Sequence, residues 1–308
     1  HMNNGVATVT LNPAIDHTIY VNTFTPNTLN RAEAVEYHIG GKGINVSKVL
    51  STLGQPSVAL GFLGRNALYF EEELKAASIE TDFVQVSGRT RTNIKVIDKS
   101  NLGCTEINEP GPYIDTASWE KLVKKVTSWA AKCEYVVIAG SLPPGVPHDS
   151  YKFLIQEAKK QGAKTVLDAD GEALKRGLQA MPFMIKPNIH ELEGLTGKQL
   201  SGSKQELLSV CRELLLAGIS VVVVSMGSEG SIYASQEGIY RVYPLKLEVK
   251  NTVGAGDAMV AGLIHGMSKG LQAEKLAAFG AAVSACQIVD DFGRLEEFSK
   301  QIRVERWV

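Results

Sequence analysis

The sequence predicts one α/β domain with a small β lid. Short β-branched runs alternate with longer amphipathic stretches over most of the chain, which is the pattern of strand–helix–strand units. The region Thr81–Ile107 departs from this alternation because it is strand-like and lacks a convincing helix. No low-complexity linker divides the chain and no internal repeat is present, so we expect a single domain.

The first alternating elements lie before residue 80. Val6–Leu11 is predicted to form a strand. Asn45–Leu53 is predicted to form a helix because its apolar residues recur at helical spacing and share one face. Val58–Leu60 is a short predicted strand, followed by a predicted helix over Ala67–Ala77.

The region from Thr81 to Ile107 supplies most of the predicted lid. It contains three β-rich runs separated by turn residues, namely Phe83–Val86, Thr92–Ile97 and Glu106–Ile107. We expect these runs to form an antiparallel excursion from the main sheet, completed by residues near Asp16–Asn22.

Regular alternation resumes after the lid. Val221–Val224 is entirely β-branched and apolar, as expected of a strand that is covered on both faces. The predicted elements are a helix over Ala117–Ala131, a strand at Tyr135–Ala139, a helix from Tyr151, strands at Lys164–Leu167 and Val221–Val224, a hairpin of Ser231–Tyr233 and Ile239–Val242, and helices over Gly256–His265 and Gln272–Val289.

Composition and charge argue against several classes of protein. Over 308 residues, Lys+Arg 32 and Asp+Glu 33 give a net charge of -1, so no general basic field favours nucleic acid. No apolar run approaches the roughly 18 residues that a membrane helix needs, and the N-terminus lacks the regions of a signal peptide. The four cysteines are scattered without a CxxC pair, so we expect separate buried thiols and a cytoplasmic location.

The strongest local motif is TVGAGD, residues 252–257. Gly254 and Gly256 flank Ala255 just before a predicted helix, so backbone N–H groups can converge there on an anionic oxygen. Asp257, in the first turn of that helix, suits accepting a proton from an attacking hydroxyl. The alternative interpretation is that Asp257 only caps the helix and stabilises its dipole.

A second glycine-rich turn, GGKGIN at residues 40–45, also opens a predicted helix. It matches neither the P-loop nor GxGxxG, because position 46 is valine. In a functional interpretation, the amide of Gly41 and the side chain of Asn45 bind polyol hydroxyls while Lys42 faces an anion. The alternative is a glycine turn with a solvated lysine.

Arg89, Arg91, Asn93 and Lys95 alternate along a predicted lid strand and therefore share one face. Guanidinium and ammonium groups so placed suit a phosphate, although a solvated strand face has the same pattern. Asp16 follows the first strand and can accept hydrogen bonds from sugar hydroxyls, or can simply shape a turn.

Two further polar segments follow apolar runs. Lys186, Asn188 and Glu191 come after one such run, and the spacing of the last two suits the water shell of Mg²⁺. The same spacing is also that of an ordinary helix cap with a capping-box glutamate. Ser225–Gly230 follows the buried strand Val221–Val224, where open α/β sheets place ligand loops, and the alternative here is a hairpin turn.

Taken in order, these motifs resemble a known family. GGKGINVSKVLSTLG and NTVGAGDAMVAG resemble the two signatures of the ribokinase/phosphofructokinase-B carbohydrate kinase family, with KPN-x-x-E and SMGSEG between them in the order of that family. TLNPAID, GGKGIN, GRTRTNIK and TEINEPGP are similar to its 1-phosphofructokinase and tagatose-6-phosphate kinase branch. The likeness runs from Thr10 to the final helices.

The resemblance implies a three-layer α/β/α ribokinase-like domain over residues 3–308, with a mostly parallel sheet and a lid from segments near 16–22 and 81–107. It implies ATP and Mg²⁺ as cofactors and a sugar phosphate as acceptor, with fructose 1-phosphate giving fructose 1,6-bisphosphate. The expected partners include neither nucleic acid nor membrane. A homodimer formed through the lid is an expectation from the family.

The resemblance also implies roles for individual residues. Asp257 is expected to act as the base, beside a hole for anionic oxygen formed by the amides of Gly254, Ala255 and Gly256. The expected substrate ligands are Asp16, Arg31, Gly41, Lys42, Asn45, Arg91 and Asn93. The expected ATP ligands are Lys186, Asn188, Ser225, Gly227, Ser228 and Gly230, with Asn188 and Glu191 holding Mg²⁺ through water.

Three alternatives stay open. Tagatose-6-phosphate kinase shares the motifs quoted above. An NAD-dependent oxidoreductase also places glycine turns before helices, although neither turn here spells GxGxxG. A sugar-phosphate-binding protein without catalysis is the third, against which the intact Gly254–Asp257 turn argues.

Overall fold

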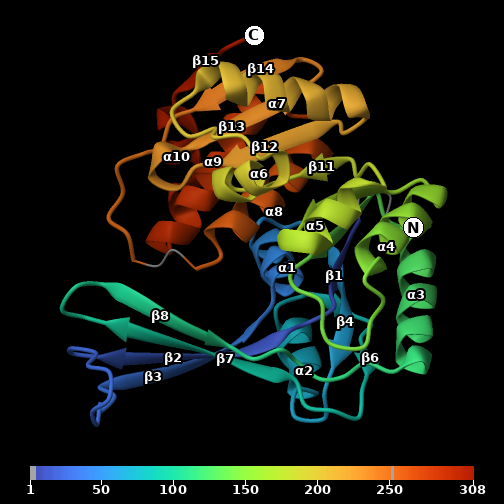
Figure 1. Cartoon of the computed structure of the whole chain (residues 1–308), viewed down its shortest axis with the longest axis vertical. Helices are drawn as coiled ribbons and strands as arrows, with labels where there is room; N and C mark the ends of the chain where they lie inside the picture. Colours follow the sequence, from blue (N-terminus) through green and yellow to red (C-terminus); the bar gives the residue numbers. More distant parts are fainter. Residues whose placement is uncertain (1–4, 251–252) are drawn as a thin grey trace.

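The computed structural model describes residues 5–250 and 253–308. Asn251 and Thr252, which open the NTVGAGDA motif, lie outside the described residues. Figure 1 shows a layered body of helices and strands from which a smaller sheet projects to one side.

The main sheet has 11 strands within the described residues, and its long central part is parallel. The strands within residues 231–306 add an antiparallel edge. The mostly parallel sheet that the sequence predicts is thereby confirmed. The strand order is β15 (Val304–Arg306), β14 (Gly238–Val242), β13 (Ser231–Ser235), β12 (Val221–Ser225), β11 (Met184–Ile185), β10 (Lys164–Asp168), β9 (Tyr135–Ala139), β1 (Val6–Thr10), β4 (Ser57–Leu63) and β5 (Glu80–Thr81), with β6 (Val84–Gln85) also on β4.

Helices cover both faces of this sheet, as its buried central strands require. Alternation along β1 sets the two layers, because Val9 packs into one apolar core and Val6 into the other. One layer consists of α3 (Thr116–Ala130), α4 (Ser150–Lys160), α5 (Gly171–Leu178), α6 (Ile189–Thr196) and α7 (Lys204–Ala217). The other consists of α1 (Lys42–Thr52), α2 (Tyr69–Ala76), α8 (Ala255–Ser268), α9 (Ala273–Val289) and α10 (Leu295–Gln301).

Every helix predicted from the sequence is present, with ends shifted by a few residues. Helices α5, α7 and α10 were not predicted, and a helix at α6 was considered only in interpreting the spacing of Asn188 and Glu191. A signal for α7 was readable, because Ser203 caps it by accepting a hydrogen bond from the amide of Glu206 at 3.3 Å. The predicted strand Val58–Leu60 is longer than expected and forms the centre of β4.

The projecting sheet, called the lid below, has the strand order β3 (Ala34–Gly40), β2 (Ala14–Val21), β7 (Arg91–Asp98) and β8 (Gly103–Asn108). The strands that form the lid differ from the predicted ones. Strand β3 was not foreseen, and β2 pairs with β7 in parallel rather than antiparallel. Residues 84–85 belong to the main sheet instead, because Phe83, Val84 and Val86 are buried in its cores.

The lid has one polar and one apolar face. Strand register aligns Asp16 with Asn93 and Asn108 on the face toward the body. The intervening positions form the opposite face, which is rich in apolar residues, such as Ile94 and Ile107. At its root, Ile39 on this face is buried in a cluster with Phe70 and Leu74 of α2, whereas Tyr37, farther out on the same face, is 64% exposed.

Two expectations about the chain as a whole can be compared with the structure. Among the described helices, none is long and apolar enough to cross a membrane. Cys133, Cys211 and Cys286 are buried free thiols, as predicted. The prediction was wrong for Cys104, which is exposed because it lies on β8 at the edge of the lid.

Close packing of α1 on β1 fixes the start of α1. Ser47 on α1 makes hydroxyl hydrogen bonds with Thr8 on β1 at 2.7 Å and with Ser57 on β4 at 3.0 Å. Nearer the helix start, Gly43 lies so close to β1 that an added Cβ would clash with Thr10 Oγ1 and lie 3.2 Å from the carbonyl oxygen of Val9.

We predict that Gly43→Ala lowers the free energy of unfolding by about 1–3 kcal/mol, the usual cost of overpacking a tight contact. Gly194→Ala is a matched control, because Gly194 also lies in a helix and its added Cβ would meet nothing within 4 Å. That control should stabilise by up to about 1 kcal/mol through helix propensity. Chemical denaturation measures both, and equal effects of the two substitutions would contradict the tight contact.

Candidate functional site

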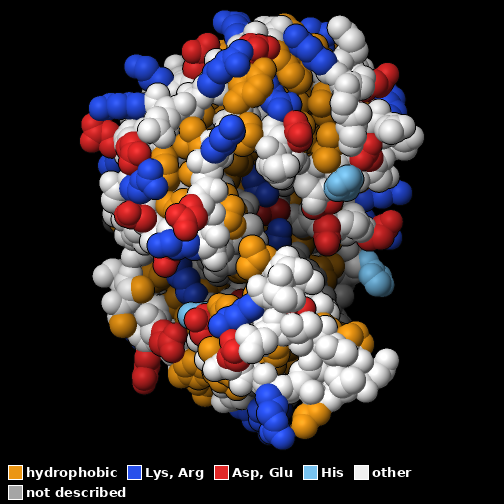
Figure 2. Space-filling view, turned by 90° about the vertical axis from the view of Figure 1, so that its left-hand side faces the viewer, with side chains coloured by type: hydrophobic (Ala, Val, Ile, Leu, Met, Phe, Trp, Pro, Cys, Tyr) orange, Lys and Arg blue, Asp and Glu red, His pale blue; other side chains and the backbone are white. Residues whose placement is uncertain are grey.

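A cleft of about 920 Å³ lies between the lid and the carboxyl edge of the main sheet. Figure 2 shows a hollow midway along the molecule, with charged side chains of both signs around it. Its wall includes Asn12 after β1, residues 140–146 after β9 and Ala169 after β10. The cleft therefore occupies the edge at which parallel α/β sheets bind ligands.

The turn into α8 is built to receive an anion. Gly254 has φ 78° and precedes the first helical residue, Ala255. The first N–H groups of a helix have no partner within the helix, and its N-terminus carries the positive end of the dipole. A Cβ added to Gly256 would lie 3.0 Å from Lys186 Nζ, so an ammonium group lies against the same turn.

Asp257 follows in the first turn of α8 and is 7% exposed. Its Oδ2 accepts a hydrogen bond from Asn45 Nδ2 of α1 at 3.0 Å. Burial raises the pKa of Asp257 to about 6, with a further contribution from the charge of Asp168, while Lys42 and the hydrogen bond from Asn45 act in the opposite direction. A carboxylate with such a pKa can act as a proton acceptor near neutral pH.

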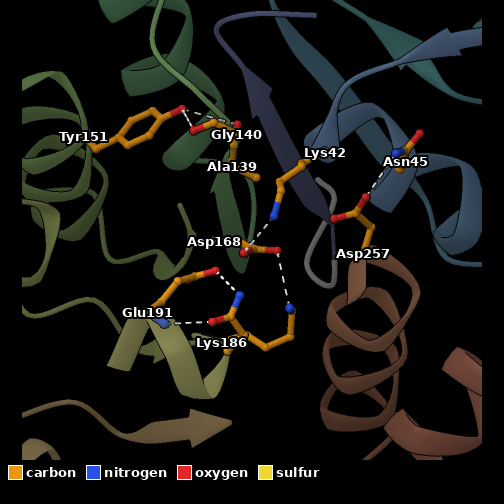
Figure 3. Close-up of polar contacts among 10 residues, drawn as sticks. Lys42, Asn45, Ala139, Gly140, Tyr151, Asp168, Lys186, Glu191 and Asp257 are labelled. Atoms are coloured by element: carbon orange, nitrogen blue, oxygen red, sulfur yellow. Dashed lines mark hydrogen bonds and ion pairs between the residues drawn. The ribbon is translucent and has the colours of Figure 1, made fainter. Parts of the chain in front are cut away.

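Asp168, the last residue of β10, was not singled out by sequence analysis, yet it lies at the centre of the site. Its side chain is 4% exposed and makes ion pairs with Lys42 Nζ at 3.3 Å and with Lys186 Nζ at 3.8 Å (Figure 3). Burial acts to lower the pKa of Lys42, but the charges of Asp168 and Asp257 outweigh it and raise that pKa. A readable signal existed, because Asp168 directly follows the predicted strand Lys164–Leu167.

Most of the predicted substrate ligands line the cleft. Burial raises the pKa of Asp16, and the positive charges of Lys95, Lys48 and Arg91 oppose this effect. Lys95, which the sequence placed on the same strand face as Arg91, also lines the cleft. The predicted ligands that line it are Asp16, Gly41, Lys42, Asn45, Arg91 and Asn93.

The guanidinium of Arg91 donates to two main-chain carbonyl groups, and the carboxylate of Asp16 lies near enough to act on its charge. Its Nη2 donates to the carbonyl oxygen of Asn12 at 3.0 Å, and its Nη1 donates to that of Glu109 at 3.2 Å. Within residues 5–250 and 253–308 it forms no ion pair, so its charge is available to an anion in the cleft. Arg31 and Arg89 are exposed and lie outside the cleft wall.

Lys186 and Asn188, which were expected to bind ATP, lie outside the residues that line the cleft. Glu191 lines the cleft, and burial raises the pKa of this carboxyl. Asn188 caps α6, since its Oδ1 accepts from the amide of Glu191 at 2.7 Å and its Nδ2 donates to Glu191 Oε1 at 2.6 Å. The capping alternative therefore holds for Asn188. Ser225, Gly227, Ser228 and Gly230 lie after β12, beside Asn188 through a bridge at Ser225 but outside the cleft wall.

A direct metal site is not apparent from the protein ligands alone. The described residues contain no group of three or more His, Cys, Asp and Glu side chains that could hold a metal ion. Mg²⁺ commonly keeps several waters and takes one or two carboxylates together with substrate phosphates. Glu191, half-buried at the cleft, fits that mode of binding.

Comparison with known proteins gives consistent matches. A sequence profile described as pfkB family carbohydrate kinase matches residues 9–290. The chain is 36% identical over 307 residues to 1-phosphofructokinase of Haemophilus influenzae, covering 97% of each. It is 36% identical over 301 residues to 1-phosphofructokinase of Bacillus subtilis, covering 97% of this chain and 98% of the relative. Phosphofructokinase-2 from Escherichia coli in complex with substrates and products superimposes with a TM-score of 0.91 at 26% identity, covering 96% of this chain and 98% of that one.

We predict that Asp168→Asn lowers the pKa of Asp257 below about 6, because the substitution removes a negative charge that raises it. Carboxyl ¹³C NMR titration measures this, with the Asp257 signal assigned by its loss in Asp257→Asn. Asp149→Asn is the control, since Asp149 lies at the surface in an ion pair with Arg176. An unchanged or raised pKa in Asp168→Asn would show that the two carboxylates do not interact.

Proposed function

We propose that this chain, which belongs to the pfkB family of carbohydrate kinases, transfers the terminal phosphoryl group of ATP to fructose 1-phosphate and so forms fructose 1,6-bisphosphate. The proposal rests on the charged and polar groups that are arranged around one cleft. A turn suited to anions and a carboxylate of near-neutral pKa lie at its middle, and the unpaired charge of Arg91 lies toward the lid.

In the proposed reaction, Asp257 accepts the proton of the acceptor hydroxyl as that oxygen attacks the terminal phosphorus of ATP, and ADP leaves. Phosphoryl transfer depends mainly on alignment and on neutralising charge, so a modest base suffices. The amides at Gly254–Gly256 and the ammonium group of Lys186 would stabilise negative charge on the group in transfer. Lys42 lies close enough to the same region to contribute a second positive charge.

The acceptor is proposed to span the cleft from Asp257 to the lid. Asp16 and Asn45 would accept from and donate to its hydroxyls, while Arg91 and Asn93 would bind the phosphate that it already carries. A forked guanidinium suits that phosphate, because two of its donors can reach two oxygens. Arg31 lies on an exposed lid loop outside the cleft wall, so the proposal gives it no role.

The nucleotide is proposed to lie beside Lys186, with the loop Ser225–Gly230 along its far side. Glu191 would hold Mg²⁺ through water, and Asn188 would orient Glu191 rather than bind the ion directly. When bound, the ion supplies positive charge to the phosphates of ATP.

The relatives favour this acceptor over the alternatives. Both curated relatives described above are named 1-phosphofructokinase, so tagatose-6-phosphate kinase is not favoured. The match to a carbohydrate kinase family over residues 9–290 argues against an NAD-dependent oxidoreductase. The buried carboxylate of Asp257, which follows the glycine turn and accepts a hydrogen bond from Asn45, has the placement of a proton acceptor and so favours catalysis over binding alone.

We also propose that two copies of the chain associate through the apolar faces of their lids. Val35, Tyr37 and Ile107 lie on that face and are 45%, 64% and 59% exposed. Burying the same face of two chains against each other gives a closed, two-fold contact. Sedimentation as a monomer at micromolar concentration would contradict this association.

The proposed acceptor is tested by comparing kcat/KM for fructose 1-phosphate, fructose 6-phosphate and tagatose 6-phosphate, with ADP release as the signal. We expect fructose 1-phosphate to exceed each of the others by roughly tenfold or more, since a misplaced phosphate loses charge-assisted contacts worth about 1.5–3 kcal/mol each. Unphosphorylated fructose is the control and should be the poorest acceptor. A higher value for either 6-phosphate would overturn the assigned acceptor.

A further inference from the structure

We propose that Asn12 is a positioning residue that orients the guanidinium of Arg91 toward the acceptor. Its side chain anchors the root of the lid, and its main chain receives one arm of Arg91. The inference rests on the proposed function, in which Arg91 binds the phosphate already present on the sugar.

The side chain of Asn12 joins three separate segments. Asn12 follows β1 and is 3% exposed. Its Nδ2 donates to the carbonyl oxygen of Pro110, just after lid strand β8, at 3.0 Å. The same nitrogen donates to Ser141 Oγ, in the loop after β9, at 3.1 Å. Both protons of the amide are thereby used to tie the end of β1 to the lid and to the cleft wall.

Both carbonyl groups that hold Arg91 depend on this anchor. The first is the carbonyl of Asn12 itself, which accepts from Arg91 Nη2. The second is that of Glu109, which accepts from Nη1 and is bonded directly to Pro110. Because proline fixes its own φ, the contact of Asn12 with Pro110 also restrains the neighbouring peptide. One side chain thus sets the positions of two acceptors on a single guanidinium.

This arrangement gives Asn12 an effect on function through Arg91. The guanidinium is planar, so two acceptors on two of its nitrogens fix its plane and the direction of its remaining donors. Without the Asn12 side chain, the main-chain carbonyl of residue 12 would still be present. That carbonyl could then move together with the root of the lid. Arg91 would keep its charge and lose its orientation, which weakens a forked contact with phosphate.

A double-mutant cycle with Arg91 tests the inference in the full chain. Asn12→Ala, Arg91→Ala and the double variant are compared with the wild type in kcat/KM for fructose 1-phosphate and in KM for ATP. Asn12→Ser, too short to reach both partners, replaces Asn12→Ala if thermal unfolding shows that the latter does not fold. Asn30→Ala is the matched control, because Asn30 makes comparable hydrogen bonds to Thr25 and Thr28 in an exposed lid loop.

We expect Asn12→Ala to lower kcat/KM for fructose 1-phosphate about tenfold, with KM for ATP within about twofold and Asn30→Ala without effect. The double variant should be no worse than Arg91→Ala alone, because Asn12 acts through Arg91. If the two losses multiply, Asn12 acts independently and the inference is wrong while the proposed function stands. If Arg91→Ala has no effect on fructose 1-phosphate, the proposed role of Arg91 is wrong and the inference falls with it.

Discussion

The buried carboxylate of Asp168 and its two ammonium partners form the interaction on which the rest of the site depends. Lys42 comes from the start of α1 and Lys186 directly follows β11, so this pairing joins the proposed acceptor side and the proposed nucleotide side of the site. Asp168 and Lys186 are buried and each charge would be costly to bury alone, whereas the side chain of Lys42 is 47% exposed. Because the net charge of these three groups is positive, they can help to neutralise a phosphate group bound beside them. Burial is the main cause of the near-neutral pKa of Asp257. The charge of Asp168 raises this pKa further, and the charges of Lys42 and Lys186 lower it.

The site also depends on the polar face of the lid. This face forms one wall of the cleft, and the carboxyl edge of the main sheet forms the other. Strict alternation along β2, β7 and β8 puts Asp16, Asn93 and Asn108 on that surface and leaves an apolar face opposite. The same alternation thus produces both the proposed acceptor contacts and the proposed association of two chains. The lid joins the body beside the end of β1, where the hydrogen bonds of Asn12 reach both the lid and the cleft wall.

Most of the layered body could be predicted because β-branched runs and helical periodicity are local signals, as for Val221–Val224 and α3. Strand β3 was missed although Val35, Tyr37 and Ile39 alternate with polar residues, which is a local strand pattern. The two glycine-rich turns could be recognised from their sequence motifs alone. The role of Asp168 was not predicted because it depends on ion pairs with Lys42 and Lys186, which only the folded sheet brings close to it. Lys42 is 126 residues away in the sequence. For Asn188 the spacing fitted two interpretations, and only the geometry shows that it caps α6.

The central claim is that Asp257 accepts a proton between two half-sites that bind their ligands without its help. Its most direct test is Asp257→Asn, a substitution of nearly equal size, measured for turnover and for binding of ADP and fructose 1-phosphate by calorimetry. We expect kcat to fall by about 10²–10⁴, the range attributed to a positioned acid–base group, while both dissociation constants stay within about threefold. Near-normal turnover in a variant that folds and binds both ligands would contradict the claim.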